Sequence, residues 1–201
     1  MKKIFTIGYS GFTTDEFIRV LLQNKINVLV DVRSSPYSKY FSEYNKEVLA
    51  VNLDKRGIYY RNFAKEFGAR QDDTAFYSEN GYLDFAKFAK SNQFEKGIEK
   101  IEKGIDQNFL FALMCAEKNP VNCHRTIMVA RAFSKLGYQI IHLQPEGKSI
   151  SQDDVDEILL DEYYPLRNQH CLFNDSMARE EMLEYSYAQK NKEIGYKKEE
   201  D

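Results

Sequence analysis

The chain has 201 residues, of which 43% are hydrophobic and 29% are charged, so it can form one sizeable core but is short for two. Its formal net charge of -3 disfavours nucleic acid as a partner without excluding a local basic pocket. No apolar run approaches the roughly 18 residues that a bilayer requires, and the N-terminus reaches Gly8 too early for a signal peptide. We therefore expect a cytoplasmic protein without membrane contact.

Short apolar segments alternate with helical patterns through the first part of the chain. These segments are residues 3–8, 27–32, 57–63, 109–115 and 138–143. Their nearly continuous apolar character is typical of parallel strands that helices cover on both faces. Strands that alternate with helices predict an α/β fold with three α/β/α layers and a mostly parallel sheet of about five strands.

Two helical regions between the strands have recognisable boundaries. Thr13 and Glu16 have the spacing of a capping box, which marks the start of a helix between the first two strands. Residues 82–104 predict one broken helix or two, because residues 91–93 and Gly97 interrupt the pattern.

The pattern changes after about Leu143 to helical segments with many charges. One helix is expected to stop near Pro165, and an acid-capped helix then runs into a charged end that we expect to fray. We therefore divide the chain into an α/β domain, residues 1–160, and a helical C-terminal extension, residues 161–201.

Three loops follow predicted strands and should meet at one edge of the sheet, because open parallel sheets bind ligands beyond the carboxyl ends of their strands. The loops are Gly8–Gly11, Asp31–Pro36 and Cys115–Arg125. In the first loop, Gly8, Tyr9 and Ser10 are candidate substrate-binding residues.

The third loop places Arg125 in the first turn of the next helix, with Asn122 as the expected N-cap. A helix start is unfavourable for a positive charge, by up to about 1 kcal/mol, unless an anion lies between them. Arg125, Asn122 and the free backbone N–H groups therefore predict a site for phosphate, sulfate or a carboxylate. The alternative is that Arg125 pairs with a structural carboxylate such as Asp31 or Glu117.

Cys115 and Cys123 are candidate nucleophiles, because the field of a helix start lowers the pKa of a nearby thiol. His124 could serve as base or acid, and Glu117 is a further candidate for catalysis. The alternative is that the cysteines only pack in the core, where buried cysteine is common. Three cysteines, an odd number, do not indicate a disulfide framework, so we expect reduced thiols.

Zinc-ligand types are also present in this loop, but the sequence predicts no metal site. Cys123 and His124 are adjacent, and on a helix their side chains would point about 100° apart. The sequence contains no Cys-x-x-Cys or His-x-x-x-His pair, and His170 with Cys171 near the C-terminus adds little.

The second loop contributes Asp31, Arg33 and Ser34. Asp31 and Arg33 are two residues apart and point to the same side of the chain. We expect both in one crevice with Arg125, Asp31 in the catalytic network, and Arg33 with Ser34 in substrate binding. The alternative is that Asp31 is only a structural loop residue.

Three segments carry a family resemblance: "TIGYS" from Thr6, "LVDVRSSP" from Leu29 and "CAEKNPVNCHR" from Cys115. In combination they resemble the DUF488 family of prokaryotic proteins, a family of unknown function. The resemblance spans roughly residues 3–160. It implies an α/β domain that gathers its matched residues at one site, and it supplies no established reaction.

A more distant similarity is to rhodaneses and cysteine phosphatases, in which a strand ends in a cysteine and an arginine opens the next helix. Cys115 and Arg125 would be the counterparts, but nine residues separate them, too many for a tight anion-binding loop. The likeness is therefore an analogy only.

Together these features predict an enzyme that acts on a phosphate-bearing or otherwise anionic small molecule or nucleotide, through a Cys/His/Arg site at the carboxyl edge of the sheet. The alternative is a non-catalytic module that uses the same pocket to sense a ligand or dock a partner. The sequence identifies neither the reaction nor a cofactor.

Overall fold

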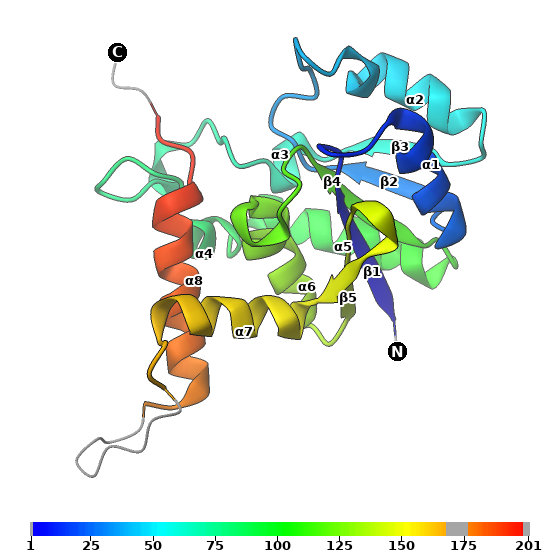
Figure 1. Cartoon of the computed structure of the whole chain (residues 1–201). Coiled ribbons are helices and arrows are strands. Elements are labelled where there is room, and N and C mark those ends of the chain that lie inside the picture. Colours follow the sequence, from blue (N-terminus) through cyan, green and yellow to red (C-terminus); the bar gives the residue numbers. More distant parts are fainter. Residues whose placement is uncertain (1, 168–176, 199–201) are drawn as a thin grey trace.

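One six-stranded sheet forms the centre of the computed structural model, which describes residues 2–167 and 177–198 (Figure 1). Its strands lie in the order β3-β2-β4-β1-β5-β6. Their bounds are β1 (Lys3–Gly8), β2 (Val28–Asp31), β3 (Tyr59–Asn62), β4 (Phe111–Cys115), β5 (Gln139–Leu143) and β6 (Ser149–Ser151). The first five strands pair in parallel and β6 is antiparallel to β5, so the predicted α/β class with a mostly parallel sheet is confirmed.

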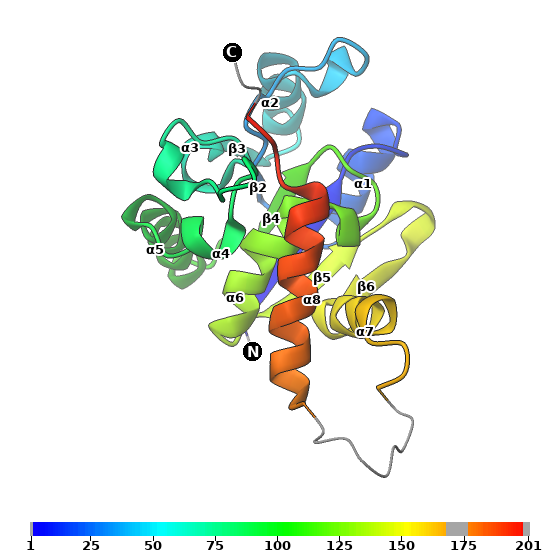
Figure 2. The ribbon, with the colours of Figure 1, turned by 90° about the vertical axis from the view of Figure 1, so that its left-hand side faces the viewer.

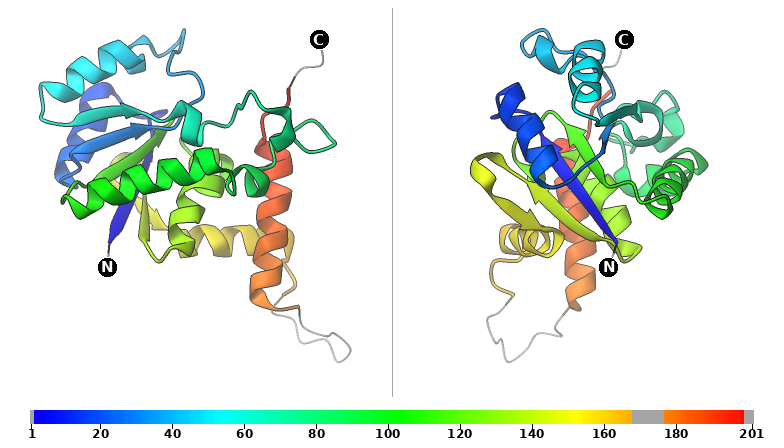
Figure 3. Two further views of the ribbon diagram at one scale, coloured as in Figure 1. Left: turned by 180° about the vertical axis from the view of Figure 1, so that it is seen from behind. Right: turned by 90° about the vertical axis from the view of Figure 1, so that its right-hand side faces the viewer.

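Helices cover both faces of the sheet and give it two apolar cores. One face carries α1 (Thr14–Gln23) and α2 (Lys46–Asp54). The other carries α3 (Ala64–Phe67), α4 (Phe85–Phe88), α5 (Asn92–Asp106), α6 (Arg131–Lys135), α7 (Gln152–Tyr163) and α8 (Arg179–Ile194). Figure 2 shows α6 and α8 in front of the sheet, and Figure 3 shows α7 and α8 together at one side of the molecule. We call these surfaces the α1 face and the α6 face.

The sequence predictions of individual elements need four corrections. The strand β6 was not predicted, because three residues carry too little pattern. The strand β3 was expected to be covered on both faces, but it lies at an edge of the sheet and three of its four residues are exposed. The region 82–104 contains two helices, but the first begins only at Phe85 and the break lies at residues 89–91. Gly97 lies inside α5, where a Cβ atom would approach the ring of Phe67 to 2.7 Å, so this glycine permits close packing and does not end the helix.

The C-terminal helices join the larger core. Leu183 and Tyr187 of α8 are buried there, and α7 ends at Tyr163, close to the predicted stop. The expectation of fraying is wrong as far as Lys198, because backbone hydrogen bonds tie Tyr196 and Lys198 to residues 81–83. His170 and Cys171 lie outside the described residues, and the division at residue 160 stays a prediction.

None of the helices in the described ranges combines the length and the apolar character needed to cross a membrane.

Candidate functional site

Two loops close against each other at the carboxyl ends of β1 and β4. The N–H of Tyr9 donates to the carbonyl of Cys115 at 3.1 Å, and the N–H of Ser10 donates to that of Ala116 at 3.0 Å. A Cβ atom on Gly8 would lie 1.8 Å from the carbonyl oxygen of Glu117. Tyr9 and Ser10 therefore hold the loops together through their backbones, and only glycine at position 8 allows this approach.

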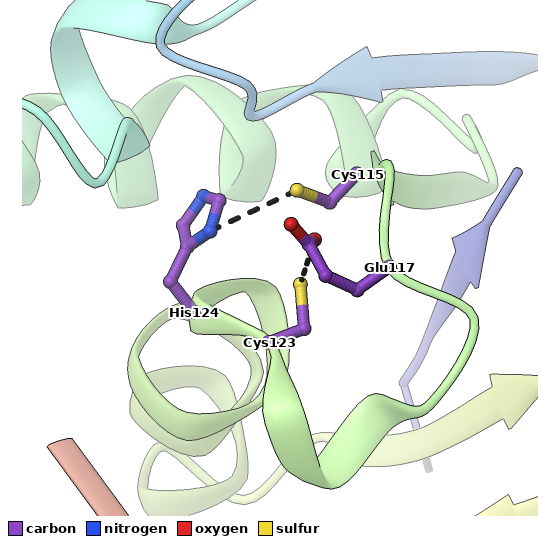
Figure 4. Close-up of side chains that lie close together, drawn as sticks. All are labelled: Cys115, Glu117, Cys123 and His124. Atoms are coloured by element: carbon purple, nitrogen blue, oxygen red, sulfur yellow. Dashed lines mark hydrogen bonds between the residues drawn. The ribbon is translucent and has the colours of Figure 1, made fainter. Parts of the chain in front are cut away.

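Four reactive side chains converge directly beneath these loops (Figure 4). They are Cys115, Glu117, Cys123 and His124, and we call them the Cys/Glu/His cluster. One potential ligand atom from each lies within 4.8 Å of all the others. Cys115 Sγ is 3.7 Å from His124 Nδ1, and Cys123 Sγ is 2.9 Å from Glu117 Oε2. The structure thus brings together the four residues of this loop that we selected as candidates for catalysis.

The backbone at Cys123 explains the convergence. Asn122 was expected to cap the helix, but it ends a 3₁₀ turn and is exposed. The next helix is the π-helix η4 (Arg125–Ala130), which continues into α6. Cys123 precedes η4 in an extended conformation (φ -138°, ψ 133°), and its carbonyl accepts the N–H groups of Thr126 and Ile127 at 3.0 Å. An extended residue followed by a helical one does not follow the 100° rule of a regular helix. Cys123 and His124 can therefore point to the same place.

The ring of His124 is fixed by a bond on its far side. Its Nε2 lies 2.9 Å from the carbonyl oxygen of Val32. Because a carbonyl oxygen only accepts, Nε2 carries a proton, and Nδ1 faces the sulfur of Cys115. Burial disfavours charge on the ring, but the interaction with Cys123 and the bond to Val32 outweigh it and raise the pKa of His124.

Burial and charge divide the protons of the cluster unequally. Burial raises the pKa of Cys115 well above its usual value. Burial would also raise the pKa of Cys123, but the hydrogen bond with Cys115 and the charge of Arg125 outweigh it and hold that pKa well below its usual value. Burial raises the pKa of Glu117. These directions favour negative charge on Cys123 and disfavour it on Cys115 and Glu117.

Arg125 is completely buried beside the cluster. Its Nη1 donates to the backbone carbonyl of Glu117 at 2.6 Å, and its Nε lies 3.5 Å from the hydroxyl of Thr6. Its Nη2 has no hydrogen-bond partner, and no carboxylate of the described residues lies within 4.0 Å of the guanidinium. Arg125 therefore pairs with neither Asp31 nor the Glu117 carboxylate, which was the structural alternative.

A buried chain of hydrogen bonds continues from Arg125 across the α6 face. The hydroxyl of Thr6 lies 2.8 Å from His142 Nδ1, and His142 Nε2 lies 3.2 Å from the amide oxygen of Gln152. The Gln152 amide donates to the Tyr187 hydroxyl at 2.7 Å, which in turn donates to Asp156. Thr6 and His142 belong to strands of the sheet. The other residues of this series, Gln152, Asp156 and Tyr187, belong to α7 and α8.

The hydrogen bonds of this series all run in one direction, from Arg125 towards Asp156. An amide oxygen only accepts, so His142 Nε2 carries its proton. Burial and the charge of Arg125 lower the pKa of His142 to about 3, so the ring is neutral and its Nδ1 accepts from Thr6. Sequence analysis missed His142, although a histidine inside the apolar strand "YQIIHL" was the available signal.

The residues expected from the second loop lie on the other side of the sheet. Asp31 accepts two bonds from Arg33, at 2.9 Å from Nε and 2.6 Å from Nη2, and a third from the hydroxyl of Tyr60 at 2.6 Å. Arg33 also donates to the carbonyl of Tyr44, which belongs to the α1 face. Burial disfavours charge on Arg33, but its bonds to Asp31 outweigh this and raise its pKa.

The expectation of one crevice for Asp31, Arg33 and Arg125 is therefore wrong. Side chains alternate along a strand, so Val32 packs in the α6 core while Asp31 and Arg33 point the other way, towards Tyr60 and Tyr44 of the α1 face. Tyr9 also lies on the α1 face, stacked on Tyr44 with ring centroids 4.4 Å apart.

Ser34 holds a neighbouring loop, because its hydroxyl accepts the N–H of Arg70 at 2.8 Å. A groove of about 1130 Å³ lies between α5 and α8, and the cluster residues do not line it. Glu117 is exposed, whereas the other three cluster residues are buried. The groove therefore does not include the cluster, and Glu117 is the most exposed of the four cluster residues.

Comparison with known families shows which family the chain belongs to. The model of the domain of unknown function DUF488 matches residues 13–132. The chain belongs to the DUF488 family. The match includes the whole Cys/Glu/His cluster and Arg125, so these residues belong to the family domain. Searches of curated proteins and of solved structures found no match.

Proposed function

We propose that this DUF488 protein is an enzyme that acts on an anionic substrate, such as a phosphate-bearing small molecule or nucleotide, at the Cys/Glu/His cluster. The observation that carries the proposal is Arg125. A buried guanidinium without a negative partner is unfavourable, because burial of a charge costs free energy that only pairing restores. Its Nη2 lacks a partner among the described residues, so a negatively charged ligand would satisfy it.

Arg125 and the Cys/Glu/His cluster would have different roles in the reaction. Arg125 would hold the negative charge of the substrate, and the cluster would supply groups that transfer protons or attack. Glu117 lies on the exposed side of the cluster, where a substrate would arrive. The backbone bond from Arg125 to Glu117 links the two parts, so an anion at Arg125 would lie next to the reactive groups.

Binding of inorganic phosphate, measured by isothermal titration calorimetry, tests the role of Arg125. Wild type should bind phosphate, and Arg125→Met should weaken binding at least tenfold, or about 1.4 kcal/mol. Lys118→Met is the matched control, because Lys118 is an exposed cation on the same loop. Equal affinity in wild type and Arg125→Met would overturn the anion site, as would an equal loss in the control.

Turnover separates an enzyme from the alternative, a module that only senses a ligand. Phosphate monoesters, phosphate diesters and nucleotides would be tested as substrates. The enzyme proposal expects turnover that Cys123→Ser or His124→Gln abolishes while phosphate binding persists. Binding without turnover of any of these classes would favour the sensing module.

A further inference from the structure

We infer that the Cys/Glu/His cluster binds one divalent transition-metal ion of the zinc class. Cys115 Sγ, Cys123 Sγ, His124 Nδ1 and a carboxylate oxygen of Glu117 would be its ligands. The argument from sequence against a metal assumed that Cys123 and His124 diverge on a helix. The extended backbone of Cys123 removes that objection.

The spacing of the four atoms fits a single ion. Zinc bonds to sulfur are about 2.3 Å long and bonds to nitrogen or oxygen about 2.0 to 2.2 Å, so the ligand atoms of a tetrahedral ion lie about 3.3 to 3.8 Å apart. The four atoms here lie within 4.8 Å of one another. Small side-chain rotations would therefore close the cage, without movement of the backbone.

The outer contacts of His124 are those of a metal ligand. Ligating histidines usually donate their second N–H to a carbonyl or a carboxylate, which fixes the tautomer and the orientation of the ring. His124 makes this bond to Val32 at 2.9 Å, on the side away from the sulfurs. Cys115 is held by strand β4, so two of the ligands sit on rigid elements.

The ligand types select the class of metal. Two thiols and an imidazole favour Zn²⁺ and its substitute Co²⁺, whereas Mg²⁺ and Ca²⁺ prefer oxygen ligands only. Binding would displace the thiol protons. Two thiolates and one carboxylate around a divalent ion would leave one negative charge, which the neighbouring guanidinium of Arg125 would balance.

Unequal exposure of the ligands indicates an exchangeable position. Cys115, Cys123 and His124 are buried, whereas Glu117 is an exposed loop residue. Zinc sites with three fixed protein ligands and one open position are typical of catalysis, and fully closed sites are typical of structure. An anionic substrate that replaced the Glu117 carboxylate would leave the charge of the site unchanged.

The metal inference uses the residues of the proposed function, but its test needs no substrate. Co²⁺ is titrated into the metal-free full-length chain, and the thiolate-to-cobalt charge-transfer absorption is recorded. One Co²⁺ per chain should give this band, and Zn²⁺ should remove it by displacement. Glu117→Gln, a change on the exposed loop, should keep the band and weaken Co²⁺ binding by roughly tenfold or more.

Cysteine variants identify the ligands. Cys115→Ser and Cys123→Ser should each weaken or shift the band, and Cys171→Ser should leave it unchanged. Circular dichroism confirms that each variant is folded before titration. A wild-type chain without the band would overturn the inference, and so would a band lost only in Cys171→Ser. Metal binding together with phosphate binding that ignores Arg125 would reject the proposed function alone, and the reverse result would reject the metal alone.

Discussion

Two buried arginines lie at the same edge of the sheet, one on each face, and they differ in what neutralises them. Arg33 on the α1 face forms a two-pronged pair with Asp31, 2.6 Å away at the closest contact. Arg125 on the α6 face has no carboxylate within 4.0 Å among the described residues and donates to a backbone carbonyl. The charge of Arg33 is balanced within the chain, and the charge of Arg125 is not.

The difference separates a network that is closed within the chain from one that leaves a buried charge without a carboxylate partner among the described residues. Arg33 keeps one unpartnered nitrogen, Nη1, but the Asp31 carboxylate and the carbonyl of Tyr44 satisfy the rest of its side chain. A closed network of this kind fixes the loop after β2. On the α6 face the unbalanced charge lies beside two thiols and an imidazole, which is the combination that a ligand or metal would complete.

The largest predicted effect is on the pair of Asp31 and Arg33 on the α1 face. Asp31→Asn removes the charge that balances Arg33 and should lower the free energy of unfolding by about 3 to 5 kcal/mol. Urea unfolding followed by circular dichroism measures the change. Co²⁺ and phosphate binding should stay near wild type in the folded variant. If stability is retained and phosphate binding is lost, the two faces form one site and the comparison is wrong.

On the α6 face, His142 should make the free energy of unfolding depend on pH. Its folded pKa of about 3 lies below the usual 6.5, so the unfolded chain takes up a proton first as the pH falls. The contribution of His142 is complete above about pH 6.5 and is lost at roughly 1.4 kcal/mol per pH unit below it, or about 2 kcal/mol by pH 5. Urea unfolding of wild type and His142→Gln at both pH values measures it. Equal pH dependence in the two proteins would contradict a buried neutral His142.

The smallest predicted effect is also on the α1 face, at Tyr60. Tyr60→Phe removes the hydroxyl that donates to Asp31 and should cost about 1 kcal/mol, the usual net value of one hydrogen bond. Thermal unfolding should show this modest loss. Because Tyr60 and the cluster lie on opposite faces, the Co²⁺ titration should be unchanged. A shifted Co²⁺ affinity would show that the faces are coupled.

The sequence predicts the fold well, because apolar strand segments and capping residues are local signals. The five parallel strands and the start of α1 at Thr13 follow from such signals. The edge position of β3 does not, since strand order depends on which helices pack where. Gly97 was taken for a break because its contact with Phe67 comes from a distant part of the chain.

The candidate site was predictable in its residues but not in its grouping. The loop from Cys115 to Arg125 contains every cluster member, and strand-end position alone selects it. Sequence spacing could not show that Cys123 is extended, and one residue of difference in the helix start decides whether Cys123 and His124 converge. Nor could it show that Asp31 and Arg125 lie on opposite faces, because that depends on which face of the sheet the helix after β4 packs against.

Direct location of a bound ion tests the account most simply. Crystals of the full-length chain loaded with Zn²⁺ would be measured on both sides of the zinc absorption edge, and an anomalous difference map would be calculated. We predict one peak on the α6 face, about 2.3 Å from the sulfurs of Cys115 and Cys123 and about 2.0 to 2.1 Å from His124 Nδ1. A map without a peak at the Cys/Glu/His cluster, or with its main peak at Asp31 on the α1 face, would contradict it.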